Sequence, residues 1–404
     1  MNLCMLTLLY PHDQVSEVTQ NAKDKLQNQI NNYQWAFIEG IKANLGLDEQ
    51  LNIINALPVG IYPLQYRKLF LSGGSHDQGS IRQMGCINLP WLKQTGRKCA
   101  AIREVERWIR ESPDNRTLLL YTQYLPYMQA VRVLKRRYPD LKVAVIVTDL
   151  PNEMGLASGR KGILKKVEYR RGNQSLQLCQ EIDGFVLLTE PMKEALNVGS
   201  RPFVIIEGLI QARDEQSSLS GDLSCDKGIF SVLYTGTLEP ELGVLEMLNA
   251  FSKRPEYELW ICGHGSLESE IEAYARKYPN IRFCGFVPQK EALALQAKAS
   301  ALINPRTPEG LFTKYSFPSK TLEYLRSAKP VICYKLEGIP DEYDPYLCYI
   351  KENSSDGIIQ AVDKLAIRAA EERMAIGEKG RRFVLSQKNP TVQCEKLVRL
   401  LRSL

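Results

Sequence analysis

The segment Ala301–Tyr334 constrains the fold most, because its pattern predicts a strand, a loop, a helix and a second strand in close succession. The first apolar run stops at Asn304-Pro305, which is a turn signal. A helix then begins at Pro318 and ends before Pro330, where a second apolar run, Val331–Cys333, begins. Two apolar strands joined by a helix form the repeating unit of a parallel sheet, so we expect an α/β fold.

The start of this helix has the residue types that bind a nucleotide-sugar. Ser319, Lys320 and free backbone N–H groups can hold an anionic phosphate there. Glu323 lies on the same helix face as Ser319, where its carboxylate can accept hydrogen bonds from sugar or ribose hydroxyls. An ordinary helix with a proline near its start is the alternative interpretation of the same residues.

The same alternation of strands and helices fills both halves of the 404-residue chain. It predicts two doubly wound parallel sheets, with ligands at the carboxyl ends of the strands. The expected strands are residues 3–10, 51–57, 68–71, 117–121, 143–147, 185–188 and 202–206 in the first half, and 230–234, 257–262, 281–284, 301–303 and 331–333 in the second. Further helices are expected at 355–369, 371–386 and 391–404. The Gly- and Ser-rich segment 72–79 is expected to be a flexible loop with His76 exposed.

Residues 208–228 are polar, rich in serine and punctuated by glycine, and they interrupt the strand–helix pattern. Such a composition is typical of a linker. We therefore expect a first domain over 1–207, a linker over 208–228 and a second domain over 229–390.

The composition is that of a globular protein, with 44% hydrophobic and 24% charged residues. A formal charge of +6 is compatible with phosphate or acidic-lipid ligands but is too small to indicate nucleic acid. The 10 scattered cysteines include no CxxC pair and indicate free thiols in a reducing compartment, and 3 histidines argue against a histidine-rich metal site. No apolar run approaches the roughly 18 residues of a membrane span, so we expect a cytoplasmic protein.

A basic segment, Arg160–Arg171, follows a glycine-containing loop and places Ile163, Leu164 and Val167 among its Lys and Arg residues. Such a helix can lie on an anionic membrane surface. A solvated surface helix is the alternative interpretation. Nucleic acid is disfavoured because Tyr169 is the only aromatic residue in the segment.

Loops with glycine, histidine or aspartate follow several expected strands, at the sheet edges where ligands bind. Gly236-Thr237 can let a bound group approach the backbone, and His264 can pack against a base or ribose. His12 can hydrogen-bond a sugar or leaving group, and Asp149 can orient an acceptor hydroxyl. Each of these residues alone is also explained as a turn or helix-cap residue, so the convergence of several such loops is the stronger signal.

Five segments of the second half resemble the nucleotide-binding domain of glycosyltransferase family 4, the group 1 glycosyltransferases of GT-B fold. They are YTGTL (234–238), LWICGHG (259–265), IRFCGFV (281–287), LINP (302–305) and FPSKTLEYLRSAKPVI (317–332). The first half is similar mainly through Val147–Pro151 and Leu188–Met192. The element FPSKxxEY resembles a branch that assembles bacterial surface polysaccharides, including capsules.

The resemblance implies two Rossmann-like domains that face each other across a cleft, with the helix 391–404 crossing back onto the first domain. It implies transfer of a sugar from a nucleotide-sugar, expected to be a UDP-sugar, to a hydroxyl acceptor. This transfer would retain the anomeric configuration and need no metal or other cofactor. The acceptor would bind the first domain. The basic segment Arg160–Arg171 suggests that this lipid-linked or glycan acceptor of polysaccharide biosynthesis is used at the inner face of the membrane.

The resemblance also implies roles for individual residues. Glu323 matches the glutamate that binds the ribose, and Ser319 and Lys320 match the helix start that receives the diphosphate. Gly236 and Thr237 match the loop that touches the phosphates. The backbone of Phe286 and Val287 matches the segment that lies beside the base.

Two departures from the family pattern affect the expected site. The family's paired glutamates stand eight positions apart, whereas a tyrosine occupies the position eight before Glu323 and Glu309 is the nearest earlier glutamate. We expect Glu309 to reach the donor sugar from a longer loop. The usual basic residue after the first glycine loop is also missing, so Arg306, Lys314 or Lys320 would supply the countercharge of the diphosphate.

Two other functions agree with parts of the pattern. A non-catalytic nucleotide-sugar-binding subunit of a polysaccharide assembly complex would keep the fold without the chemistry, as the Glu309–Glu323 spacing allows. A dinucleotide-dependent oxidoreductase would require GxGxxG after a strand, and neither YTGTLEP nor CGHGSLE completes that motif.

Overall fold

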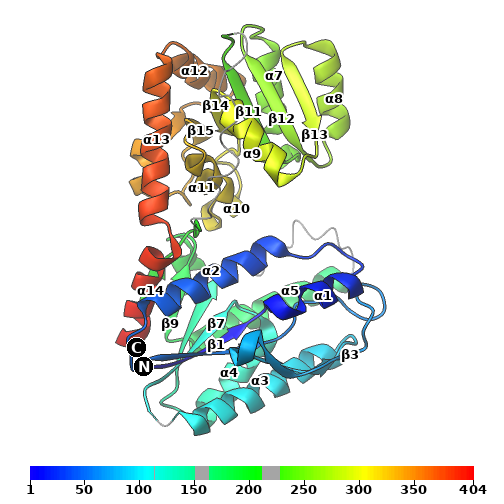
Figure 1. Cartoon of the computed structure of the whole chain (residues 1–404), viewed down its shortest axis with the longest axis vertical. Helices are drawn as coiled ribbons and strands as arrows, with labels where there is room; N and C mark the ends of the chain where they lie inside the picture. The colour runs from blue at the N-terminus through cyan, green and yellow to red at the C-terminus, as the bar shows by residue number, and fades with distance from the viewer. Residues whose placement is uncertain (113, 151–162, 212–227) are drawn as a thin grey trace. The chain divides into compact units, whose positions relative to one another are not determined.

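The chain forms two compact units in the computed structural model, which describes residues 1–112, 114–150, 163–211 and 228–404 (Figure 1). Unit 1 contains Met1–Leu209 together with Pro390–Leu404, and unit 2 contains Ile210–Asn389. The expected linker 208–228 lies mostly outside the described residues.

Unit 1 is built on an eight-stranded sheet in the order β10-β9-β8-β7-β1-β2-β5-β4. Neighbouring strands run parallel except β4, which is antiparallel to β5. The strands are β1 (Asn2–Thr7), β2 (Gln50–Asn55), β4 (Gly74–His76), β5 (Ile81–Gln83), β7 (Arg116–Tyr121), β8 (Lys142–Val147), β9 (Gly184–Leu187) and β10 (Phe203–Ile205). The central strands are buried on both faces, which explains their nearly continuous apolar sequences.

Helices cover this sheet, and a short ribbon stands outside it. The helices are α1 (Val15–Asn21), α2 (Asn28–Asn44), α3 (Leu92–Glu111), α4 (Leu125–Arg137), α5 (Ile163–Leu178), α6 (Met192–Ala195) and α14 (Pro390–Ser403), with 3-10 turns η1 (His12–Gln14) and η2 (Asp77–Gly79). The ribbon pairs β3 (Phe70–Leu71) antiparallel with β6 (Cys86–Ile87).

Two sequence predictions for unit 1 are wrong. The apolar pattern predicts a strand of the sheet at 68–71, but β3 pairs with β6 outside the sheet. The segment expected to be a flexible loop contains the edge strand β4 and the turn η2, because glycines let two backbones approach closely. A Cβ on Gly85 would lie 2.7 Å from the Gly73 nitrogen. His76 is half-buried there, and its Nδ1 lies 3.2 Å from Oδ2 of Asp13.

The C-terminal helix α14 belongs to unit 1, where it packs against α2. Leu397 and Val398 of α14 share a buried apolar cluster with Phe37 and Ile41 of α2. The two helices are close enough that a Cβ on Gly40 would lie 2.4 Å from a backbone oxygen of α14. The N and C termini therefore lie side by side in this unit (Figure 1).

Unit 2 has a parallel sheet of six strands in the order β13-β12-β11-β14-β15-β16. The strands are β11 (Ser231–Thr237), β12 (Glu258–His264), β13 (Ile281–Gly285), β14 (Ala301–Asn304), β15 (Val331–Tyr334) and β16 (Cys348–Ile350). The helices are α7 (Val244–Ser252), α8 (Glu268–Lys277), α9 (Gln289–Lys298), α10 (Leu311–Tyr315), α11 (Ser319–Arg326), α12 (Ser355–Ala366) and α13 (Ala370–Gln387). The expected α/β class is thus confirmed.

The strand order of unit 2 marks a place for a ligand. From β11 the sheet extends through β12 and β13 to one side, and through β14, β15 and β16 to the other side. Doubly wound sheets bind ligands where the order reverses, at the carboxyl ends of the two central strands. Of the helices in the described ranges, none is both long enough and apolar enough to cross a membrane.

Candidate functional site

The carboxyl ends of β11 and β14 separate at the centre of the unit 2 sheet, and a tyrosine occupies the gap. The two strands pair at Val232 and Leu233. Farther along, the Thr235 N–H donates to the Tyr324 hydroxyl oxygen over 2.8 Å, and this hydroxyl donates to the Thr235 carbonyl oxygen over 3.0 Å. Burial raises the pKa of Tyr324 and keeps the hydroxyl a neutral donor. These bonds hold α11 against the end of β11.

Glu323 precedes this tyrosine on α11, and its carboxylate is held from two sides. Gln296 Nε2 donates to Glu323 Oε1 over 2.9 Å, and Lys320 Nζ donates to Oε2 over 3.1 Å. Gln296 comes from α9 and is fully buried, whereas 37% of the Glu323 side-chain surface is accessible. A fixed carboxylate with accessible lone pairs can accept hydrogen bonds from sugar or ribose hydroxyls.

Cationic groups gather near the start of α11. Ser319 is exposed and Lys320 is half-buried in the first turn of the helix. Arg306 follows β14, and burial lowers its pKa to about 10, which leaves it protonated at neutral pH. Lys314 Nζ lies 3.8 Å from Oε2 of Glu337, so this cation already has a carboxylate partner. The helix start with Lys320 and Arg306 is an arrangement that can bind a diphosphate.

The loop after β11 touches the loop after β14, and glycine is required for this contact. Gly243 has a φ of 76°, and a Cβ there would lie 2.0 Å from the Pro305 oxygen. Gly236 packs against its own strand, because a Cβ there would lie 2.7 Å from the Tyr234 hydroxyl. That hydroxyl donates to the Thr237 carbonyl oxygen over 2.7 Å. Close packing alone therefore explains Gly236, and the phosphate contact of Gly236-Thr237 stays a prediction.

Two exposed rings lie at the carboxyl ends of the next strands. The His264 side chain is 78% exposed at the end of β12 and is paired with the Glu268 carboxylate. Phe286 is 73% exposed and directly follows β13, while Val287 packs against the core. An exposed aromatic face can stack on a nucleotide base. The contact of His264, Phe286 and Val287 with the nucleotide stays a prediction.

The contacts of Glu309 place it near the end of β15. Asn353 Nδ2 donates to Glu309 Oε1 over 2.7 Å. Burial, together with the negative charges of Glu246 and Glu309, raises the pKa of Tyr334 to about 12. The groups around Glu309 thus differ from those that hold Glu323, which come from α9 and α11. The expected action of Glu309 on the donor sugar stays a prediction.

In unit 1, His12 stands at the carboxyl end of β1 with its ring fixed. Its Nδ1 lies 3.2 Å from Asp77 Oδ2, and its ring centroid lies 4.0 Å from that of Trp35. Asp77 also accepts from the backbone N–H groups of His12 and Asp13, each over 3.1 Å. Burial alone would raise the pKa of Asp77, but these hydrogen bonds outweigh it and lower the pKa. An ionised Asp77 favours the Nδ1–H tautomer of His12, which leaves Nε2 as an acceptor.

Asp149 follows β8 at the same sheet edge. Its strand is separated from β1 by β7, so the ends of β8 and β1 stand roughly 10 Å apart. Desolvation raises the pKa of Asp149, against the opposing effect of its hydrogen bond with Thr148. A carboxylate with a raised pKa exchanges a proton nearer to neutral pH, as an acceptor-activating group requires. The structure brings His12 and Asp149 to one edge, and their catalytic roles stay predictions.

The basic segment is described only in part. Arg160 and Lys161 lie outside the described residues. The helix α5 carries the rest of the segment, and Lys166, Arg170 and Arg171 are exposed on it.

Three positioning residues escaped the sequence analysis, namely Tyr324, Gln296 and Asp77. Tyr324 stands beside Glu323 in the motif FPSKxxEY, but the sequence analysis assigned it no role. Gln296 and Asp77 act on residues that are distant in the sequence, and only the fold brings them together. Gln296 is fully buried on α9, and this unusual burial of an amide becomes visible only in the structure.

Comparisons with known proteins agree with this architecture. Residues 221–383 match the family model described as "Glycosyl transferases group 1". No curated protein sequence matches the chain.

Several solved structures resemble the whole chain. Sucrose-phosphate synthase from Thermosynechococcus elongatus is 11% identical with a TM-score of 0.60, over 100% of this chain and 99% of that chain. An E. coli structure described as trehalose-6-phosphate bound with UDP-2-fluoro glucose is 11% identical with a TM-score of 0.66. The match covers 100% of this chain and 99% of that chain. The catalytic domain of starch synthase IV from Arabidopsis thaliana, bound to ADP and acarbose, is 11% identical with a TM-score of 0.60. The match covers 99% of this chain and 99% of that chain.

At these identities the structural likeness shows the fold, which is GT-B, and the family match adds the class of enzyme. The matched segment contains the strand order, the fixed Glu323 and the cationic helix start of unit 2. The chain is therefore a glycosyltransferase of GT-B fold that carries a group 1 glycosyltransferase domain.

Proposed function

We propose that this enzyme binds a nucleoside-diphosphate sugar on unit 2 and transfers the sugar to an acceptor hydroxyl bound by unit 1. The observation that carries the proposal is the Glu323 carboxylate, held by Gln296 and Lys320 beside the start of α11. This geometry offers acceptors for the ribose hydroxyls next to donors for the diphosphate. The complexes of similar fold that contain UDP-2-fluoro glucose and ADP support a nucleoside diphosphate, and we propose UDP.

The chemistry needs stabilisation of the charge that develops on the departing diphosphate. We assign this role to Lys320, Arg306 and the first-turn N–H groups of α11, in place of a metal ion. In unit 1, His12 and Asp149 would orient the acceptor hydroxyl. Transfer with retention of the anomeric configuration is part of the proposal, and the anomeric proton coupling of the product measures it.

We further propose that the acceptor is a lipid-linked oligosaccharide of bacterial surface polysaccharide synthesis, used at the cytoplasmic face of the membrane. The exposed basic residues of α5 support this location, because anionic lipids attract such clusters.

Calorimetric titration with UDP, GDP, dTDP, ADP and NAD tests the donor site. We expect one nucleoside diphosphate to bind, and Glu323→Ala to weaken its binding at least tenfold because a charged hydrogen-bond partner is lost. The matched control is Glu272→Ala, which removes an exposed carboxylate of α8 and should leave binding unchanged. Binding of NAD alone would overturn the proposal in favour of an oxidoreductase.

A non-catalytic nucleotide-sugar-binding subunit remains a second candidate, because the contacts of Glu309 differ from those of Glu323. Such a protein would pass the calorimetric test but would release no nucleoside diphosphate from a bound nucleotide-sugar in the presence of acceptor. A turnover assay with the wild type therefore separates the two functions.

A further inference from the structure

A band of exposed apolar side chains lies on unit 1, along the ribbon β3–β6 and the start of α3. Phe70 and Ile87 face each other in the register of the ribbon, and they are 66% and 40% exposed. Trp91 and Leu92 begin α3, which packs against β6, and they are 67% and 52% exposed. Single exposed apolar residues are common, but a continuous group of large ones marks an interaction surface.

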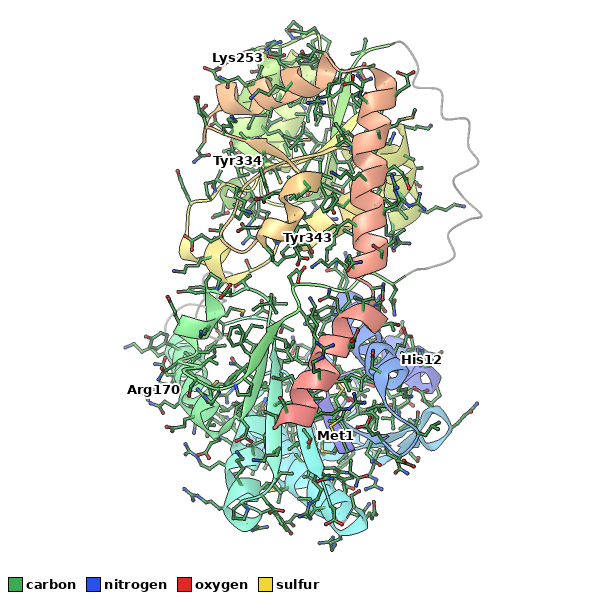
Figure 2. All side chains as sticks on the ribbon, turned by 90° about the vertical axis from the view of Figure 1, so that its left-hand side faces the viewer. Met1, His12, Arg170, Lys253, Tyr334 and Tyr343 are labelled. Carbon is green, nitrogen blue, oxygen red and sulfur yellow. The ribbon has the colours of Figure 1, made fainter. Side chains whose placement is uncertain are left out.

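The basic face of α5 adjoins this band. The Arg171 guanidinium lies 5.2 Å from the centre of the Trp91 ring, which joins α5 to the start of α3. Lys166, Tyr169 and Arg170 are also exposed on α5. Figure 2 shows Arg170 at the outside of unit 1, on the opposite side from His12 in that view. The contact between Arg171 and Trp91 therefore joins the band and this helix face into one surface.

We propose that this apolar–basic surface docks on an anionic lipid bilayer. It consists of Phe70, Ile87, Trp91, Leu92, Lys166, Tyr169, Arg170 and Arg171. Tryptophan and tyrosine favour the membrane–water interface, where one end of the ring is apolar and the other is hydrated. Aliphatic and phenyl groups enter the boundary of the acyl chains, and Lys and Arg bind the phosphates of anionic headgroups.

The chemistry of the surface favours lipid over a protein partner. The ribbon and the first turn of α3 present the apolar groups, and basic groups stand beside them on α5. Each exposed basic residue strengthens binding to an anionic surface roughly fivefold. The proposal extends the proposed function, because a lipid-linked acceptor is presented at such a surface, but it depends on no step of the transfer reaction.

Vesicle binding by the full chain tests the proposal, with neither donor nor acceptor present. Vesicles of phosphatidylcholine alone are compared with vesicles that also contain phosphatidylglycerol, by flotation and by tryptophan emission. Trp91 is the reporter, because Trp108 is buried and the other two of the 4 tryptophans are half-buried. We expect flotation with the anionic vesicles and a blue shift of the emission, and we expect Trp91→Phe to abolish most of the shift.

Two sets of variants separate the contribution of the basic residues to vesicle binding from that of the apolar residues. The combined change Lys166→Gln, Arg170→Gln and Arg171→Gln should weaken partitioning roughly a hundredfold, as three losses of about fivefold multiply. The combined change Trp91→Ser and Leu92→Ser should weaken it at least tenfold at the same salt concentration. The matched controls are Leu47→Ser, a fully exposed apolar residue elsewhere in unit 1, and Arg276→Gln with Lys277→Gln in unit 2.

Two results of the vesicle experiments would overturn the proposal. Absence of binding to anionic vesicles, or equal weakening by the control variants, contradicts it. If Trp91→Ser with Leu92→Ser instead converts a dimer to a monomer in analytical ultracentrifugation and no vesicle binds, the surface is an interface between copies of the chain. Nucleotide titration of every variant verifies folding, and normal nucleotide binding without vesicle binding rejects this inference while leaving the donor site intact.

Discussion

The two units present the same part of a parallel sheet, its carboxyl edge, and stabilise it with different chemistry. In unit 2 two neutral groups, the Tyr324 hydroxyl and the Gln296 amide, hold the edge together with the charged Lys320. In unit 1 it carries titratable groups, including the His12–Asp77 pair, Asp149 and the buried Lys93 of α3. The family model matches unit 2 and not unit 1. The comparison teaches that hydrogen bonds across separate elements fix the edge in unit 2, whereas the edge in unit 1 carries groups whose charge depends on pH.

The largest expected effect concerns His12. We expect His12→Gln to lower turnover about 100-fold without changing nucleotide affinity, because the group proposed to orient the acceptor is lost. Asp77→Asn should change the pH profile of turnover, because the tautomer of His12 is no longer fixed. His76→Gln is the matched control, since its partner is Asp13 and it is half-buried. An equal loss in the control, or a loss of nucleotide binding in His12→Gln, would remove the distinction between the two edges.

The next effect is structural and lies in unit 2. Tyr324→Phe removes the partner of the Thr235 N–H and C=O groups, which stay buried. We expect the free energy of unfolding to fall by about 2 kcal/mol in chemical denaturation. Tyr349→Phe, which removes a bond to Asp344 at the surface, should cost less than about 1 kcal/mol. If Tyr324→Phe and Tyr349→Phe lowered the free energy of unfolding equally, the separated ends of β11 and β14 would not depend on the Tyr324 hydrogen bonds.

The pH dependence of stability sharpens the comparison further. Burial, and then the charge of Arg97, lower the pKa of Lys93 from 10.5 to about 7, although Lys93 Nζ donates to the carbonyl oxygens of Val59 and Gly60. Between these two pKa values the unfolded chain binds more protons at this residue, so its contribution to stability rises with pH from about 7 to 10.5.

Denaturation at pH 7.5 and at pH 9.5 checks this sign in the wild type and in Lys93→Met. We expect the stability of the wild type relative to the variant to be greater at the higher pH. If the free energies of unfolding of the two proteins changed equally between these pH values, the lowered pKa of Lys93 would be contradicted.

The smallest expected effect concerns Gln296. We expect Gln296→Leu to weaken nucleotide binding about fivefold, because Glu323 loses one of the two groups that orient it. Stability should change by less than about 1 kcal/mol, since among the described residues the buried Gln296 Oε1 has no hydrogen-bond partner and its removal offsets the lost bond. Unchanged nucleotide binding would show that Lys320 alone positions Glu323.

The periodic parts of the fold were predictable from the sequence. Buried parallel strands require continuous apolar runs, so β1, β7 and β11 follow from their residues alone, as do α12 to α14 from theirs. The segment 68–79 was not predictable, because its pairing depends on the close approach of Gly73 to Gly85, which a linear pattern does not encode.

The candidate site was predictable where a motif occupies one helix start, and not where distant segments meet. Ser319, Lys320 and Glu323 share one helix, so their grouping follows from the helical period. Gln296 reaches Glu323, and Asp77 reaches His12, through the packing of separate elements. The exposed band of Phe70 and Trp91 was missed for the same reason, because an apolar residue in a sequence predicts burial.

The position of α14 has a consequence for the order in which this protein is made. The apolar face of α2 that contains Phe37 and Ile41 is covered by Leu397 and Leu401, nearly the whole chain later. During translation, this face emerges early and stays uncovered until the residues of α14 leave the ribosome. Unit 1 is therefore begun before unit 2 and completed after it, and during that interval the uncovered apolar face of α2 exposes the nascent chain to aggregation.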